Sequence, residues 1–202
     1  MSCTTSTLYK SIESCPGKKN LAGIRRRLYY IDKTSIVQFP QLKPIGGEGV
    51  TKMEDLAQLQ GDFVLKEGKF FQFIDLKDEA SNVTYETVGE NGSKIFLNKA
   101  NAIVVGQPDE VKGFSRQALN DDIVYVYQNR NGSFCVLGND VFQCHTSPSG
   151  DTGTEITGAS TSTFAIEVYD ECPIPTYKGV LELSANTVIN CETGLEEVSS
   201  EE

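Results

Sequence analysis

Hydrophobic and polar residues alternate in several short stretches of the chain, and this period of two is typical of β-strands. Between residues 70 and 76, large apolar side chains fall on both faces of an extended chain: Phe70, Ile74 and Leu76 on one face, Phe71 and Phe73 on the other. A strand with one solvated face would alternate cleanly between apolar and polar. We therefore expect this strand to be covered on both faces, either by the rest of the chain or by another subunit.

The strongest local signal is a β-hairpin. Two β-favouring runs, 123–127 and 133–137, flank the sequence Asn129-Arg130-Asn131-Gly132. Asn-Gly tolerates the positive φ that a tight hairpin turn requires. Other stretches with strand-like composition are residues 28–31, 82–88, 94–105, 164–168 and 177–183.

One helix is predicted, between Pro108 and Asn120. Proline followed by two acidic residues suits a helix N-terminus, where carboxylates complement the unpaired amides. Val111, Phe114 and Ala118 then form one apolar stripe. This stripe predicts packing against a core.

Two segments read as long loops. One spans about residues 40–62. Its first part, 40–50, contains Pro40 and Pro44 and carries Gly46, Gly47 and Gly49 at the predicted tip, so we expect no regular element in 40–50. Residues 146–160 are almost wholly Ser, Thr, Gly and Pro and predict a second loop.

The resulting fold class is mainly β: an antiparallel β-sandwich or barrel with one short flanking α-helix. We expect a flexible basic arm over residues 1–20, a single β domain over 21–191 and an acidic tail over 192–202. The 202 residues suffice for one sizeable core.

The net charge of the chain limits the classes of binding partner that we expect. The chain has 28 acidic and 18 basic residues, a formal charge of -10, which argues against DNA binding through phosphate contacts. The first 34 residues have the opposite net charge, because they contain seven basic residues, including Arg25, Arg26 and Arg27, and only two acidic ones. This basic segment is either a solvated terminus or a contact with the acidic face of a neighbouring copy. No window is apolar enough to span a bilayer and no secretion signal is present, so we expect an intracellular protein without a membrane partner.

The sequence offers little for metal or redox chemistry. Its six cysteines, at positions 3, 15, 135, 144, 172 and 191, include no Cys-x-x-Cys pair, and His145 is the single histidine. Zinc ligands normally arrive in close pairs. We expect no metal site and no cofactor, and reduced cysteines that pack as small hydrophobes.

The candidate catalytic groups are weak. Cys144 and His145 are adjacent, and neighbouring residues of a strand point to opposite faces. Asp151-Thr152-Gly153 matches the motif of aspartic proteases, but it occurs once and no apolar strand precedes it. We expect a protein that is not an enzyme.

Between Gly61 and Tyr177 the order of several short blocks resembles the tail tube (major tail) proteins of phages and prophages of Bacteroidetes-type bacteria. The blocks that carry the resemblance, together with one just before that region, are Asn20–Ile24, Gly68–Phe73, Ala118–Asp121, Asn129–Gly132 with Val136–Gly138, Gly150–Thr157 and Pro173–Tyr177.

The resemblance implies a subunit that assembles into a ring, usually hexameric, and stacks into a tube around a DNA channel. Its partners would be other copies and other tail proteins, with DNA only as transient cargo of the lumen. The location would be the virion tail, reached from the bacterial cytoplasm. The candidate assembly interface comprises Arg25, Arg26, Arg27, Gly46, Gly47, Gly49, Phe71 and Phe73.

Other functions stay open at this point. One is a different virion component on the same fold, such as a tail terminator, a head–tail connector or the tube of a contractile injection system. Another is a β-sandwich module that binds a carbohydrate or protein ligand, although the chain lacks Trp, the best stacking residue. An enzyme built around Asp151 or Cys144 ranks last.

Overall fold

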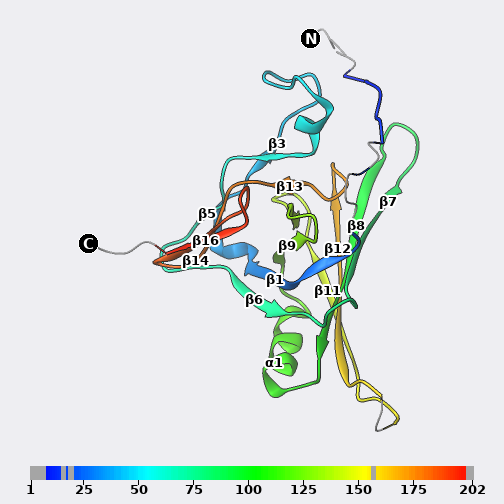
Figure 1. The fold of residues 1–202 in the computed structure, drawn as a ribbon, viewed down its shortest axis with the longest axis vertical. Helices are drawn as coiled ribbons and strands as arrows, with labels where there is room; N and C mark the ends of the chain where they lie inside the picture. Colours follow the sequence, from blue (N-terminus) through cyan, green and yellow to red (C-terminus); the bar gives the residue numbers. More distant parts are fainter. Residues whose placement is uncertain (1–7, 15–16, 18–20, 156–157, 199–202) are drawn as a thin grey trace.

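In a computed structural model of the chain, the described residues are 8–14, 17, 21–155 and 158–198 (Figure 1). Their regular structure consists of antiparallel sheets, a single α-helix and two short 3-10 helices, of which the first is η1 (Lys33–Ser35). The mainly β class predicted from the sequence is confirmed. The sheets do not close into a barrel, so the sandwich is the better description. No helix of the described residues combines the length and the hydropathy needed to cross a membrane.

The middle layer is a five-stranded sheet in the order β13-β10-β9-β1-β6. Its strands are β13 (Thr176–Tyr177), β10 (Phe134–Leu137), β9 (Ile123–Asn129), β1 (Ile24–Asp32) and β6 (Gln72–Asp75). The predicted hairpin is β9–β10, and Gly132 takes φ +102° in its turn. That positive φ is the reason for Asn-Gly at this position.

The second layer is a four-stranded sheet in the order β11-β12-β8-β7. Its strands are β11 (His145–Asp151), β12 (Thr161–Asp170), β8 (Ile95–Val105) and β7 (Asn82–Val88). The loop predicted over residues 146–160 is wrong in its first part, because β11 pairs with β12 from His145↔Glu167 to Asp151↔Thr161. An edge strand tolerates Ser, Gly and Pro when its partner supplies the hydrogen bonds, and composition alone does not reveal that pairing.

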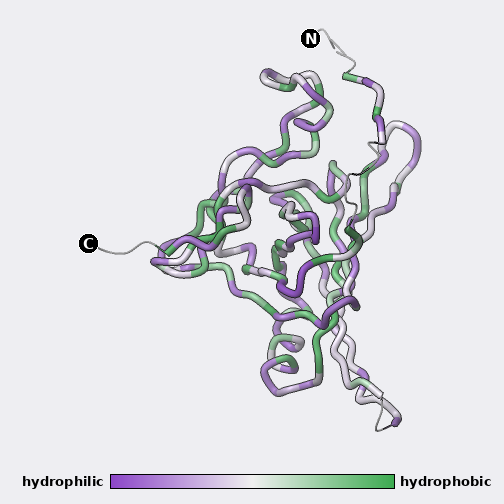
Figure 2. Tube along the Cα trace, in the orientation of Figure 1, coloured by the Kyte–Doolittle hydropathy of each residue, from purple (hydrophilic) through white to green (hydrophobic). Residues whose placement is uncertain are grey.

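The main core lies between these two sheets. Tyr125, Leu137, Phe164 and Ile166 are all at most 1% exposed there. Helix α1 (Asp109–Ala118) closes one end, and the Phe114 ring lies 5.2 Å from that of Phe164. The predicted helix and its apolar stripe are therefore confirmed. Figure 2 shows hydrophobic stretches along the central strands, while the connection between β7 and β8 is polar or neutral.

A second core covers the opposite face of the five-stranded sheet. A three-stranded sheet packs there, formed by β14 (Val180–Ser184), β15 (Thr187–Asn190) and β16 (Leu195–Val198), and a two-stranded ribbon of β2 (Ile36–Gln38) and β5 (Val64–Leu65) joins it. Phe71 is 1% exposed in this core, and its N–H donates to the Glu182 carbonyl at 2.8 Å. The five-stranded sheet is thus covered by the same chain on both faces.

The segment predicted as an irregular loop over 40–62 contains regular structure. β3 (Gln41–Leu42) pairs with β4 (Leu59–Gln60), and a 3-10 helix, η2 (Met53–Ala57), lies between them. The loop expected over 40–62, with no regular element in 40–50, was wrong in part because strand pairing and side-chain bonds stabilise what composition disfavours. The Asp55 carboxylate accepts 2.9 Å hydrogen bonds from the N–H groups of Thr51 and Lys52, and these bonds lower its pKa.

The ends of the chain also differ in part from expectation. The strand predicted over 177–183 is divided between β13 and β14. The acidic tail predicted over 192–202 includes β16, which pairs with β15 and whose residues are all exposed. Residues 199–202 and much of the predicted arm, 1–7, 15–16 and 18–20, lie outside the described residues. Within the arm, Lys10 forms an ion pair with Glu54 of η2 at 2.8 Å.

Candidate assembly interface

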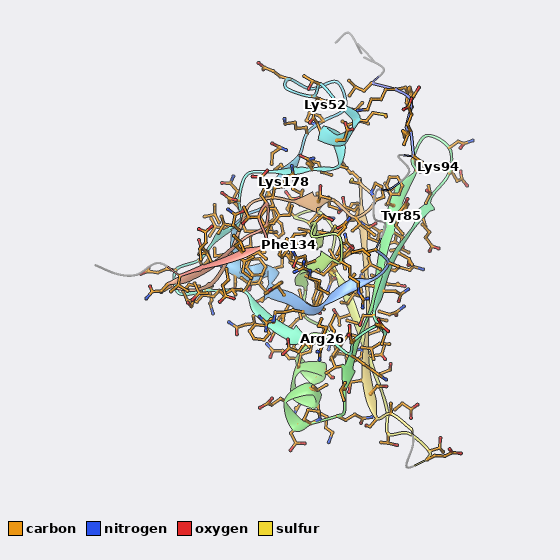
Figure 3. All side chains as sticks on the ribbon, in the orientation of Figure 1. Arg26, Lys52, Tyr85, Lys94, Phe134 and Lys178 are labelled. Carbon is orange, nitrogen blue, oxygen red and sulfur yellow. The ribbon has the colours of Figure 1, made fainter. Side chains whose placement is uncertain are left out.

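The three candidate arginines lie in an irregular stretch of β1. Ile24 pairs with Asn129 and Leu28 pairs with Tyr127, so Arg25, Arg26 and Arg27 lie opposite a single residue of β9. Such a bulge twists a strand and redirects its side chains. Arg25 and Arg26 are exposed, and Figure 3 shows Arg26 beside the middle of the molecule.

The two candidate phenylalanines have different environments. Phe71 is buried in the second core and is therefore not available to a partner in this fold. Phe73 is 47% exposed, and the Arg27 guanidinium lies 4.0 Å above the centre of its ring. The same guanidinium bonds the Asp75 carboxylate at 3.3 Å. Arg27 is therefore already engaged within its own chain.

The glycine tip is separate from the arginines. Gly46 and Gly49 take φ +77° and +76° in the projecting β3–β4 segment, whereas Arg25–Arg27 belong to β1 (Figure 1). At Gly47 an added Cβ would lie 2.8 Å from the Pro44 ring, so the close turn itself requires glycine. The predicted site residues therefore form at least two surfaces.

The structure adds a third surface, the two edges of the four-stranded sheet. Among the described residues, β7 and β11 each pair on one side only. On β8, the Ile103 N–H bonds Ser81 and its carbonyl bonds Lys77, so odd-numbered residues of β8 point their backbone groups towards β7. Because backbone groups alternate sides along a strand, Val83, Tyr85 and Thr87 direct theirs away from β8, to the open edge.

The same argument applies to β11. The Gly106 N–H donates to the Ser160 carbonyl, so even-numbered residues of β12 pair with β8 and odd-numbered ones with β11. Thr146, Pro148 and Gly150 then have their backbone groups on the open edge. Proline has no N–H to donate, so its position there is the one a sheet tolerates.

The outer face of this sheet is largely polar and carries few charges, although Val105 and Tyr169 are exposed there. Side chains that point away from the core include Asn82, Thr84, Asn101, Thr161, Thr163, Ser147 and Ser149. Lys99 bridges Glu86 at 2.8 Å and Glu167 at 3.7 Å across three strands. The hydrogen bond to Glu86 raises the pKa of Lys99.

The alternative catalytic residues are placed unfavourably for chemistry. Cys144 is fully buried, and burial raises the pKa of its thiol, so the nucleophilic thiolate is disfavoured. His145 is exposed, on the other side of the strand. Burial also raises the pKa of Cys135 to about 11 and that of Cys172 and Cys191 to about 12. The described residues contain no group of three His, Cys, Asp or Glu side chains arranged to hold a metal ion.

Sequence reasoning missed the open edges. The strand over 82–88 was predicted, but its place at the edge of a sheet depends on long-range pairing with β8. Pro148, in a stretch read as loop, was the one local signal of the second edge. No family model matches the sequence, and no match was found among curated proteins or solved structures.

Proposed function

We propose that the protein is a non-enzymatic, self-assembling structural subunit of the phage tail-tube kind, whose copies join through the open edges β7 and β11. The supporting observation is the β7 edge itself. Natural proteins protect edge strands with proline, bulges, lysine or short length. β7 has seven residues in regular register with β8, it contains no proline, bulge or lysine, and its one charged side chain, Glu86, is paired with Lys99 of β8.

The other edges of the larger sheets are protected or short. β14 has five residues, its register is irregular between Glu182 and Ser184, and the Glu182 carbonyl is already bonded by the Phe71 N–H. β13 has two residues, and β6 has four. β16 also has four residues and carries Glu196 and Glu197, which would repel an identical strand. β7 is therefore the edge best suited to pair with another chain.

Cyclic symmetry makes β11 the natural partner of β7. The strands alternate in direction across the order β11-β12-β8-β7, so β11 and β7 run in opposite directions. Rotation about an axis roughly along the strands preserves strand direction. The β11 of the next copy then lies antiparallel to β7, and the ladder continues from one subunit to the next until the ring closes.

One register satisfies both edges. Tyr85 faces Pro148 of the neighbour, Val83 faces Gly150 and Thr87 faces Thr146. The side chains of these residues, apart from Gly150, which has none, point to the inner face of the sheet, so the register places side chains of both strands on the same face. The Tyr85 side chain, 57% exposed at the edge of the sheet in Figure 3, covers Pro148 of the next copy.

In this arrangement the polar outer face forms the wall of the lumen. Hydroxyl and amide side chains offer a DNA backbone no cation except Lys99, which two carboxylates already neutralise. A basic wall would retain the polyanion, whereas a weakly acidic one lets it pass. DNA is then transient cargo, the further partners are other tail proteins, and the location is the virion tail after assembly in the bacterial cytoplasm.

The proposal is tested by assembly combined with amide exchange. The purified full chain is examined by sedimentation velocity over a concentration series, by negative-stain imaging and by residue-resolved hydrogen exchange. We expect rings or tubes, with new protection at the amides of Val83, Tyr85 and Thr87. The amides of Thr84 and Glu86, already bonded to β8, serve as the internal control.

Two results would contradict the proposal. A monomer at every concentration would favour the binding-module alternative. Assemblies in which the three outward amides of β7 exchange as fast as in the monomer would show that another surface joins the copies. Closed rings that never stack would support a terminator or connector over a tube.

A further inference from the structure

A groove lies on the face of the five-stranded sheet that points away from the four-stranded sheet. Two adjoining pockets of about 490 and 630 Å³ form it, and they share Arg25, Gln128, Phe134 and Gly194. Phe134 is 2% exposed and Gln128 is 9% exposed, so both form the floor. The turn between β15 and β16 forms one wall.

Arg25 and Arg26 form no ion pair among the described residues, and the groove beside them is also lined by the acidic Glu196. Among the described residues, no carboxylate lies within 4.0 Å of the guanidinium of Arg25 or Arg26, although Arg27 has Asp75 and Lys178 has Glu192. In a chain with a formal charge of -10, two adjacent unpaired arginines are unusual. Beneath them, the Gln128 amide donates to the Gly132 carbonyl at 2.9 Å, and its oxygen accepts no hydrogen bond from the described residues.

We propose that this arginine groove binds the acidic tip of the β11–β12 hairpin, residues 151–155, from a second copy of the chain. The inference rests on the proposed function, since it needs a self-assembling subunit, but it concerns a surface separate from the sheet edges. The Asp151 and Glu155 carboxylates neutralise Arg25 and Arg26.

Charge and shape favour this tip over the other acidic segments. The sequence contains no lysine or arginine between Arg130 and Lys178, so the hairpin carries negative charge without compensation. Residues 152–155 and 158–160, which follow β11 and precede β12, extend beyond the sheet and away from the body (Figure 1). Many other carboxylates are already engaged, such as Asp78 and Glu79 with Arg130.

The β11–β12 tip does not bind the arginine groove of its own chain. The hairpin continues the four-stranded sheet, whereas the groove lies on the far side of the five-stranded sheet. The contact therefore joins two copies, and it is heterologous, because one copy supplies the tip and the other the groove. Contacts of this kind repeat along an assembly.

Reciprocal charge reversal tests the contact. One variant carries R25E and R26E, a second carries D151K and E155K, and a control carries K69E and K112E, two exposed lysines that do not line the groove. Sedimentation velocity of the full chain gives the dissociation constant for self-association, and circular dichroism confirms folding. Each reversed variant alone is expected to associate at least about tenfold more weakly, with the loss reduced at high salt.

An equimolar mixture of the two reversed variants is the decisive sample. In that mixture every acidic tip meets a basic groove and every basic tip meets an acidic groove, so association recovers towards wild type. Assembly of wild type with no effect of reversal, or no recovery in the mixture, overturns this contact and leaves the ring proposal standing. A wild-type chain that stays monomeric overturns the proposed function, and the contact with it.

Discussion

Replacing Thr87 by proline tests the proposed hydrogen bonds between β7 of one copy and β11 of the next, because it removes a single backbone N–H. The Thr87 N–H points to the open edge of β7, so proline at this position removes no hydrogen bond to β8. The Thr87 side chain is exposed, and its loss leaves no cavity. The monomer should therefore remain folded while the edge becomes unable to pair. Thr87→Val, which keeps the N–H, is the matched control.

The expected magnitude follows from the ladder. Three outward N–H groups on β7 and two on β11, where Pro148 has none, give five hydrogen bonds in the proposed register. At about 0.5–1.5 kcal/mol net for each bond, the ladder contributes roughly 2.5–7.5 kcal/mol to each contact. Thr87→Pro removes one bond, and the proline ring displaces the neighbour's Thr146 from a second. The loss is about 1–3 kcal/mol, or roughly 5- to 150-fold in the dissociation constant.

Sedimentation velocity on the two Thr87 variants measures this difference, and urea unfolding of each monomer shows whether the fold is unchanged. A weaker association of Thr87→Pro with an unchanged unfolding midpoint supports the edge contact. Equal association of the proline and valine variants, both folded, would refute the pairing of β7 with a neighbour.

Three further changes have defined outcomes. Phe164→Ala removes a fully buried ring packed against Phe114, and we expect a loss of about 3–5 kcal/mol in the free energy of unfolding, measured with urea. Replacing residues 43–56 by a short Gly-Ser linker leaves the β3–β4 pair in place, and we expect a folded chain that forms no tubes by negative stain; tubes of normal length would show that this segment has no role in stacking. Burial raises the pKa of Asp170, so wild type loses stability as pH rises from the ordinary Asp value, about 3.9, through that raised value. Asp170→Asn keeps an acceptor for the Cys172 N–H and should be more stable than wild type at pH 7, with the difference vanishing at pH 3.5.

Sequence patterns predicted the elements that are determined by residues close together in the chain. The β9–β10 hairpin follows from Asn131-Gly132, and α1 follows from its acidic first turn and apolar stripe. β11 and β16 were missed because their residues favour loops and become strands only by pairing with β12 and β15. Phe71 was assigned to a partner because the sequence does not reveal that β14 supplies its cover.

The candidate site also combines features that local sequence shows with features that depend on distant parts of the chain. The sequence shows Arg25 and Arg26 as part of a basic cluster, but the groove beside them requires the β15–β16 turn, which lies far along the chain. The open edges depend on strand order, and strand order is not a local property of any segment.

The layering of the molecule is the reason that we propose assembly through the four-stranded sheet and not through the five-stranded one. The five-stranded sheet is covered on both faces by its own chain, and its edges are short. The four-stranded sheet is covered on one face only, and both of its edges are seven residues long. Pro148 removes one donor from the β11 edge, so two β11 strands pair poorly with each other, whereas β7 retains all of its donors. A β7–β7 pair would leave both β11 edges open, whereas pairing of β7 with β11 occupies both edges of every copy, and the proposed ring rests on that repetition.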